Sequence, residues 1–173
     1  MKKIFFFAIV PFTAIIFTGC KKGSTNNDIL LDTFKVNIGS SENTFHVQAK
    51  ATKLSVTTGF GIKIQGYNKD PGQSTTNLSF IIISPNEISA GIYAENPNTN
   101  PLVQMTHFVE GPFGTGVATS NYGSAANPLK ITIIEVTPYS IKGTFEGELK
   151  GSSSGGGTPV KELLTNGVFH VSF

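Results

Sequence analysis

Polar and apolar residues alternate along most of the chain after Phe34. The clearest case is 141–149, where apolar residues or glycine occupy one set of alternate positions and polar residues the other: Ile141, Gly143, Phe145, Gly147 and Leu149 against Lys142, Thr144, Glu146 and Glu148. A period of two is typical of a strand with one solvated face. Similar alternation covers 34–38, 45–50 and 60–67, and no window has a convincing helical period. The pattern therefore predicts strands throughout.

Turn signals separate these segments at short intervals. Asn68–Gly72 combines Pro with Gly, and glycine-rich stretches at 111–116 and 151–157 are expected to be loops. The run 78–83 ends apolar on both faces, which predicts a central strand. We therefore predict an all-β fold, an antiparallel β-sandwich or a partly open β-barrel of roughly nine to ten strands. Alternation alone does not choose between these two architectures.

The first twenty residues have a different character. Lys2 and Lys3 precede an apolar run, 4–17, and the segment closes on Phe17-Thr18-Gly19-Cys20, the only cysteine. This layout is that of a bacterial lipoprotein signal. We predict a signal peptide at 1–19, a flexible tether at 20–32 beginning with lipidated Cys20, and one all-β domain at 33–173.

Two alternatives explain the leader less well. A transmembrane helix needs roughly 20 apolar residues, whereas the apolar run covers only 14 and contains Pro11. An ordinary secretory signal would leave Cys20 as a chance thiol, yet that thiol stands between Thr-Gly and a polar spacer, a poor place for burial. Lipidation is the reading that explains the position of Cys20.

Composition excludes several classes of partner. The chain has 13 Lys and no Arg against 11 Asp and Glu. Because Lys2 and Lys3 belong to the leader, the remainder is close to neutral. Nucleic-acid binders concentrate basic residues on one face, and bidentate phosphate recognition favours Arg. We expect no nucleic-acid partner, no cofactor, and a membrane partner through the acyl anchor.

Four short sequence motifs resemble those of a known family: Gly91-Ile92-Tyr93, Ile131–Val136, Ile141–Gly147 and Thr165–Phe169. In this order they resemble a group of uncharacterised all-β lipoproteins of Bacteroidota. The resemblance implies an all-β fold and an envelope location, and it brings no activity with it. In that group, surface-exposed lipoproteins carry acidic residues after the cysteine, whereas Asp28 is the first here. The implied location is the outer membrane, facing the periplasm.

Candidate catalytic and metal-binding residues are sparse. His46, His107 and His170 are far apart and show no metal-ligand spacing, so no metal site is predicted. The stretch 111–116 has the outer spacing of a phosphate loop but Val117 where Lys is required. Glu146 and Glu148 fall on one face of a strand, as a glycosidase pair would, but alternation alone produces the same arrangement.

The leading hypothesis is a lipid-anchored envelope lipoprotein that binds or scaffolds and is not an enzyme. The alternative is a carbohydrate-binding accessory lipoprotein, because sugar rings stack on exposed aromatic side chains. The chain has no Trp, and Tyr122 and Tyr139 lie in expected turns. These two tyrosines are the candidate ligand-binding residues, with a glycan or an envelope protein as partner.

Overall fold

The computed structural model describes residues 29–70, 75–96, 102–111, 114–120, 126–153 and 160–173. Within these ranges every regular element is a strand, which confirms the all-β prediction, and there are eleven strands instead of nine or ten. They are β1 (Thr33–Ile38), β2 (Ser41–Thr44), β3 (Val47–Leu54), β4 (Phe60–Tyr67), β5 (Thr76–Ser84), β6 (Gly91–Ala94), β7 (Leu102–Gly111), β8 (Gly114–Ser120), β9 (Lys130–Val136), β10 (Ser140–Ser153) and β11 (Val160–Ser172). In the described part of the chain, no helix could cross a membrane.

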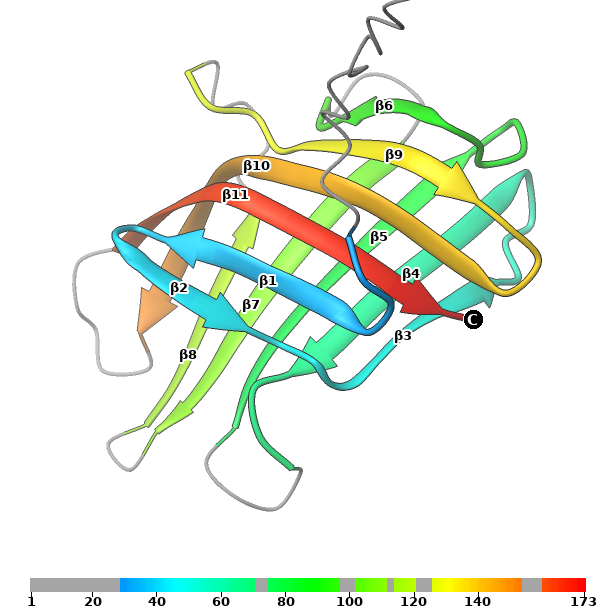
Figure 1. Ribbon diagram of the computed structural model, residues 1–173. Helices are drawn as coiled ribbons and strands as arrows, with labels where there is room; N and C mark the ends of the chain where they lie inside the picture. The colour runs from blue at the N-terminus through cyan, green and yellow to red at the C-terminus, as the bar shows by residue number, and fades with distance from the viewer. Residues whose placement is uncertain (1–28, 71–74, 97–101, 112–113, 121–125, 154–159) are drawn as a thin grey trace, which may run out of the picture.

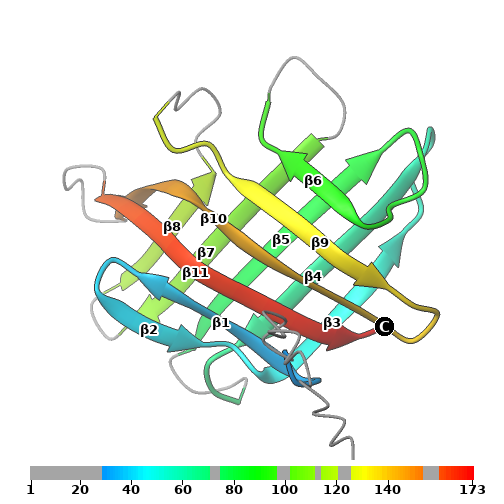
Figure 2. The same ribbon diagram turned by 45° about the horizontal axis from the view of Figure 1, so that its top comes forward.

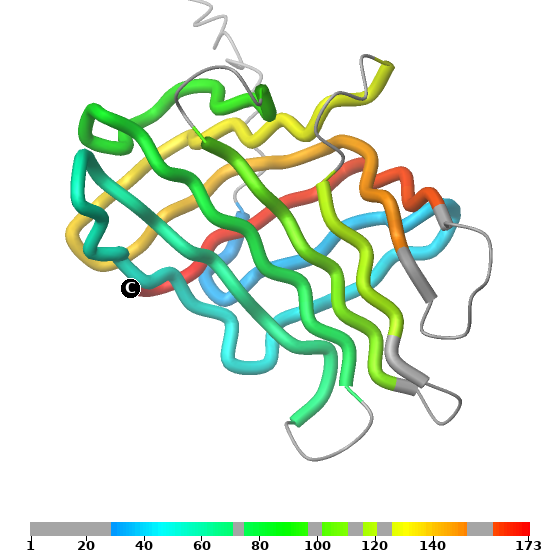
Figure 3. Tube along the Cα trace, turned by 180° about the vertical axis from the view of Figure 1, so that it is seen from behind, coloured from blue at the N-terminus to red at the C-terminus, as the bar shows by residue number. Residues whose placement is uncertain are grey.

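Nine strands form one antiparallel sheet in the order β2-β1-β11-β10-β8-β7-β5-β4-β3, and β9 and β6 extend it from β10. The sheet curls into a half-barrel whose two layers face each other (Figures 1 and 3). Long β10 joins the layers, because residues 141–146 pair with β9 and residues 149–153 pair with β8. The structure thus decides the architecture that alternation left open.

Five phenylalanines fill the space between the layers. Phe34, Phe45, Phe80, Phe145 and Phe169 are almost fully buried, and their ring centroids lie 5.2–6.3 Å apart in tilted or edge-to-face pairs. These are the geometries that aromatic quadrupoles favour. Each buried phenyl group contributes about 1.5–3 kcal/mol of transfer free energy, so this cluster is the centre of the core.

Two glycines make room for two of these rings. Gly143 of β10 pairs with Phe169 of β11, and Phe145 of β10 pairs with Gly167 of β11. A Cβ on Gly143 would lie 2.2 Å from the carbonyl oxygen of Thr132 and 2.7 Å from the Phe169 ring. A Cβ on Gly167 would lie 2.5 Å from the carbonyl oxygen of Phe145. Each phenyl group thus covers a glycine of the neighbouring strand. This packing explains the glycine and phenylalanine positions in two of the four sequence motifs, Ile141–Gly147 and Thr165–Phe169.

The expected single strand at 45–50 is wrong in detail. The strand is interrupted at Phe45 and His46, and a register shift follows between Val47 and Lys50, with Gln48 at a φ of 51°. We attribute this interruption to the burial of Phe45, whose side chain packs between the two layers. A bulge then restores the alternation of β3.

Two expected loops are also partly strand. β8 begins at Gly114, inside the stretch 111–116, and β10 continues to Ser153, inside 151–157. The backbone groups of these residues pair with those of adjacent strands: β7 with β8, and β8 with β10. Main-chain pairing outweighs the weak strand propensity of Gly and Ser here.

Candidate functional site

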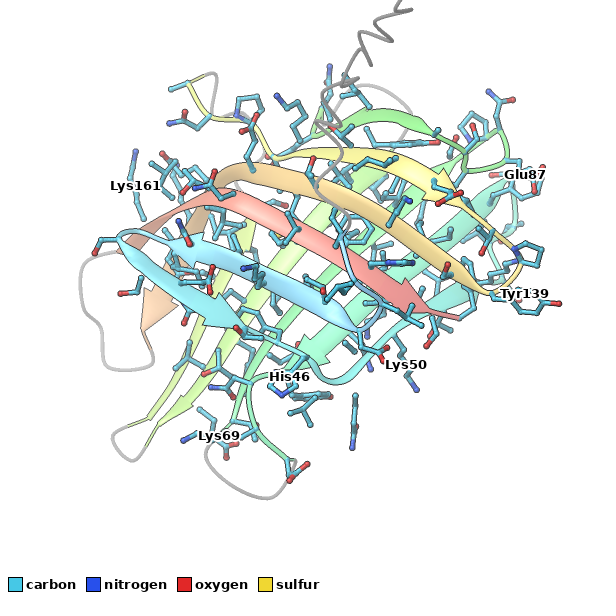
Figure 4. The ribbon with its side chains drawn as sticks, viewed as in Figure 1. His46, Lys50, Lys69, Glu87, Tyr139 and Lys161 are labelled. Atoms are coloured by element: carbon cyan, nitrogen blue, oxygen red, sulfur yellow. The ribbon has the colours of Figure 1, made fainter. Side chains whose placement is uncertain are left out.

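A pocket of 270 Å³ opens at one end of the half-barrel. The strand ends that form it are those of β3, β4 and β9, together with the segment between β5 and β6 (Figure 2). We call it the end pocket, and its lining residues are Lys53, Leu54, Gly59, Phe60, Gly61, Ile62, Glu87, Ile88 and Val136. Figure 4 places Glu87 and Tyr139 at this same end.

Phe60 gives the end pocket an exposed aromatic wall. In β4, Ile62 and Ile64 face the core and are buried. Phe60 shares their side of the strand by alternation, but it lies at the strand end and is 49% exposed. A large apolar side chain that faces inward without being covered marks the place where the core meets solvent.

Lys53 brings a positive charge to these apolar walls. It follows Ala51, a buried residue of β3, by two positions and so lies on the inner side of the strand. Its Nζ lies 5.1 Å from the centroid of the Phe173 ring, within cation–π range. Among the ion pairs of the described residues, neither Lys53 nor Glu87 takes part. Apolar walls with a few convergent polar groups are typical of small-molecule sites.

A second depression lies on the outer face of β9, β10 and β11. It has a volume of 520 Å³, is lined by Thr132, Thr144 and Asn166 among others, and adjoins one of 320 Å³. Lys130 and Glu146 line both, and they form an ion pair with each other. Because these two charges already neutralise each other on an exposed surface, neither is left to bind a charged group of a ligand. The end pocket is therefore the stronger candidate site.

The three histidines occupy different surroundings. His107 is buried, with Nδ1 2.7 Å from Glu162 Oε2, and its Nε2 has no hydrogen-bond partner. His170 lies on the outer face and donates from Nδ1 to the carbonyl oxygen of Ile29 at 2.6 Å. His46 is exposed between β2 and β3. Across the residues that the structure describes, no three potential metal ligands of the His, Cys, Asp and Glu type gather together.

Glu146 and Glu148 each have a lysine partner. A register shift at Gly147, whose φ is 150°, separates them along β10. Exposed Glu146 pairs with Lys130, whereas buried Glu148 lies 3.3 Å from Lys161 Nζ. The two carboxylates are therefore neutralised separately, in contrast to a catalytic pair that shares one site.

Tyr139 is 81% exposed in the turn between β9 and β10. Thr137 stabilises this turn, because its Oγ1 accepts hydrogen bonds from the backbone N–H groups of Tyr139 and Ser140. The expected exposure of Tyr139 is confirmed, and a role in sugar binding stays a prediction. Tyr122 and Cys20 lie outside the described residues.

Two carboxyl groups away from the end pocket have perturbed acidity. Burial raises the pKa of Glu95, and a 3.1 Å hydrogen bond from the backbone N–H of Leu129 partly offsets this. The hydrogen bond and the charge of Lys142, at 2.7 Å, lower the pKa of Glu135. Glu95 is thus a destabilising buried charge, and Glu135 belongs to a surface ion pair.

Sequence reasoning missed the end pocket. Lys53 and Phe60 lie on the paired strands β3 and β4, and only the curling of the sheet brings Val136 of β9 to them. One signal was present, because Lys53 occupies an apolar-face position in an alternating strand.

Comparison with known proteins adds no family: no family model, no curated protein and no solved structure matches the chain. The resemblance to Bacteroidota lipoproteins therefore stays a prediction.

Proposed function

We propose that the chain is an outer-membrane lipoprotein, acylated on Cys20 and facing the periplasm, that acts by binding and not by catalysis. The observation that carries the binding role is the end pocket. Apolar walls and exposed Phe60 meet there with Lys53, which forms no ion pair among the described residues. The leader and the lone cysteine support the anchor.

The size and chemistry of the end pocket favour a small amphipathic ligand. Its 270 Å³ lies just below the range of about 300–1,000 Å³ that small-molecule sites occupy. Phe60, Ile62 and Val136 offer an apolar surface, and Lys53 and Glu87 offer the polar contacts. Apolar walls with a few polar contacts are the composition that such a ligand requires.

Methyl NMR of isoleucine-labelled protein tests this role, with octanoate as the amphipathic probe. We expect the methyl signals of Ile62 and Ile88, which line the end pocket, to shift on titration. The signal of Ile131, buried in the core, is the internal control. A titration that moves no pocket methyl with octanoate, a long-chain amine or an uncharged alcohol would remove the proposal.

Two variants sharpen the titration. Phe60→Ala removes apolar contact and Lys53→Gln removes the charge, so both should weaken octanoate binding. Lys35→Gln is the matched control, since Lys35 pairs with Glu42 on an exposed surface instead. Equal weakening by all three variants would contradict a specific site.

A carbohydrate-binding role is the second candidate, and the exposure of Tyr139 favours it. Exposed aromatic rings can stack on the apolar faces of sugars. A glycan array with Tyr139→Ala and Tyr122→Ala variants tests it, and the absence of binding on a broad panel would retire it.

The anchor has its own test. A Cys20→Ser variant should lose incorporation of labelled palmitate, and retained incorporation would refute acylation at this position. Protease treatment of intact cells should leave the domain uncut if it faces the periplasm.

A further inference from the structure

Four of the most exposed apolar side chains in the described part of the chain are Leu30, Leu31, Phe60 and Tyr139. Their exposed fractions are 75%, 53%, 49% and 81%. They come from three separate segments: the stretch before β1, the start of β4, and the turn between β9 and β10. Large apolar side chains that gather at one surface indicate an interaction site.

Contacts of the last residues of β11 place these segments at one end of the half-barrel. Leu30 and Leu31 lead directly into Thr33, which pairs with His170 near the end of β11. The backbone N–H of Phe173 donates to the carbonyl oxygen of Tyr139. Lys53 Nζ lies over the Phe173 ring. Lys53 is near the end of β3, and the next strand along the chain, β4, begins with Phe60. The last residues of β11 therefore connect all three segments.

One exposed apolar residue lies at the opposite end instead. Leu163 lies near the start of β11, close to Lys161, which Figure 4 shows at the opposite end from Tyr139. Ile92 and Ile134 belong to the β6–β9 edge of the front layer. We call the four residues of the first group, of which Phe60 lines the end pocket, the end patch.

The chain leading to Cys20 also leaves from this end. The carbonyl oxygen of Ile29 accepts a hydrogen bond of 2.6 Å from Nδ1 of His170. From Cys20 to Ile29 a fully extended chain reaches only about 30 Å. An acyl group on Cys20 therefore limits how far Ile29, and with it this end of β11, can lie from the bilayer.

We infer that the end patch rests on the lipid surface in which the chain is anchored, so that the end pocket opens towards lipid. This inference rests on the acylation of Cys20 in the proposed function. Tyr at headgroup depth, with Leu and Phe side chains below it, is the arrangement that membrane interfaces favour. An amphipathic molecule could then pass from the bilayer into the end pocket without crossing water.

The lack of Trp in the chain permits a clean test. The mature, acylated Tyr139→Trp protein is reconstituted into phosphatidylcholine–phosphatidylglycerol vesicles with or without brominated acyl chains. Bromine should remove most of the emission of the Trp at position 139. A Leu163→Trp protein is the matched control, because Leu163 is 45% exposed at the other end and its Trp should keep its emission.

Each outcome decides the inference. Vesicle flotation with equal emission in both lipids would leave the anchor standing and overturn the inferred orientation. Equal quenching of both Trp variants would mean that the domain lies on its side, and would also overturn it. Absence of flotation would remove the anchor and this inference together, while octanoate binding in detergent would still report on the end pocket.

A second variant guards against a folding artefact. Leu30→Asp and Leu31→Asp together charge the end patch outside any strand, so the circular dichroism spectrum should not change. Added to Tyr139→Trp, they should restore much of the lost emission. Unchanged quenching in this triple variant would contradict a contact made by the end patch.

Discussion

Replacing Gly143 by alanine should destabilise the domain strongly. Its Cβ would stand 2.2 Å from the carbonyl oxygen of Thr132 and 2.7 Å from Cζ of Phe169. The ring could move only by pushing into neighbouring Phe80 and Phe145, and the carbonyl oxygen belongs to paired β9. No change of rotamer relieves both contacts.

The magnitude follows from the type of contact. Extra methyl groups in a packed core usually cost about 1–3 kcal/mol, and a clash with paired backbone places Gly143→Ala at about 3 kcal/mol. For a domain of this size, that corresponds to a decrease in Tm of roughly 6–12 °C. Gly116→Ala is the matched control in a strand, since the nearest atom to its Cβ would be Val109 Cβ at 3.9 Å. That control should stay neutral or gain about 0.4–1 kcal/mol.

Urea unfolding of the unlipidated mature chain, followed by circular dichroism, measures both variants. Gly167→Ala should behave like Gly143→Ala, because its Cβ would lie 2.5 Å from the carbonyl oxygen of Phe145. Adding Phe169→Leu to Gly143→Ala should cost less than the sum of the two single changes, since the ring clash disappears. A free energy of unfolding for Gly143→Ala within about 0.5 kcal/mol of that for Gly116→Ala would refute the packing argument.

Three further predictions concern charged groups. Folding raises the pKa of Glu95, so the stability of the domain should fall as the pH rises from the ordinary pKa of the carboxyl group, near 4.5, through its raised pKa in the folded state. Glu95→Gln should flatten this fall in a series of thermal melts recorded at different pH values. Lys142 lowers the pKa of Glu135, so this ion pair stabilises the fold above the pKa that Glu135 has in the unfolded chain, and the stabilisation is lost as the pH falls through its pKa in the folded chain. Lys142→Met should raise the pH at which the carboxyl ¹³C signal of Glu135 titrates. An unchanged titration would contradict the pairing. Glu162→Leu should cost about 2–3 kcal/mol by leaving buried His107 without a partner, and adding His107→Leu should recover much of it in a urea double-mutant cycle; additive losses would count against this coupling.

Much of the strand content could be predicted because alternation reports burial directly. The residues 141–149 alternate in sequence, and their apolar set is buried in the structure. The prediction of a central strand at 78–83 is confirmed, since β5 lies between β4 and β7. Both results follow from the period of two that any strand imposes on its side chains.

The candidate site was less predictable. Tyr139 could be singled out because a turn beside a strand end exposes its side chain, and it is exposed. The same reasoning gave no sign that Phe60 and Val136 line one pocket, because 75 residues of chain separate them. Bulges such as that at Gln48 were also hidden, since they arise where a buried ring pulls the backbone out of register.

The sequence by itself determined that this chain is built from strands, which face of each strand is apolar, and where a leader ending in Cys20 stands. Only the tertiary structure decided that the sheet closes into a half-barrel, that Gly143 and Gly167 sit beneath rings of the neighbouring strand, and that an end pocket exists. The physical reason is that alternation is a local property of one strand. Pairing order and curvature depend on contacts between strands that lie far apart along the chain.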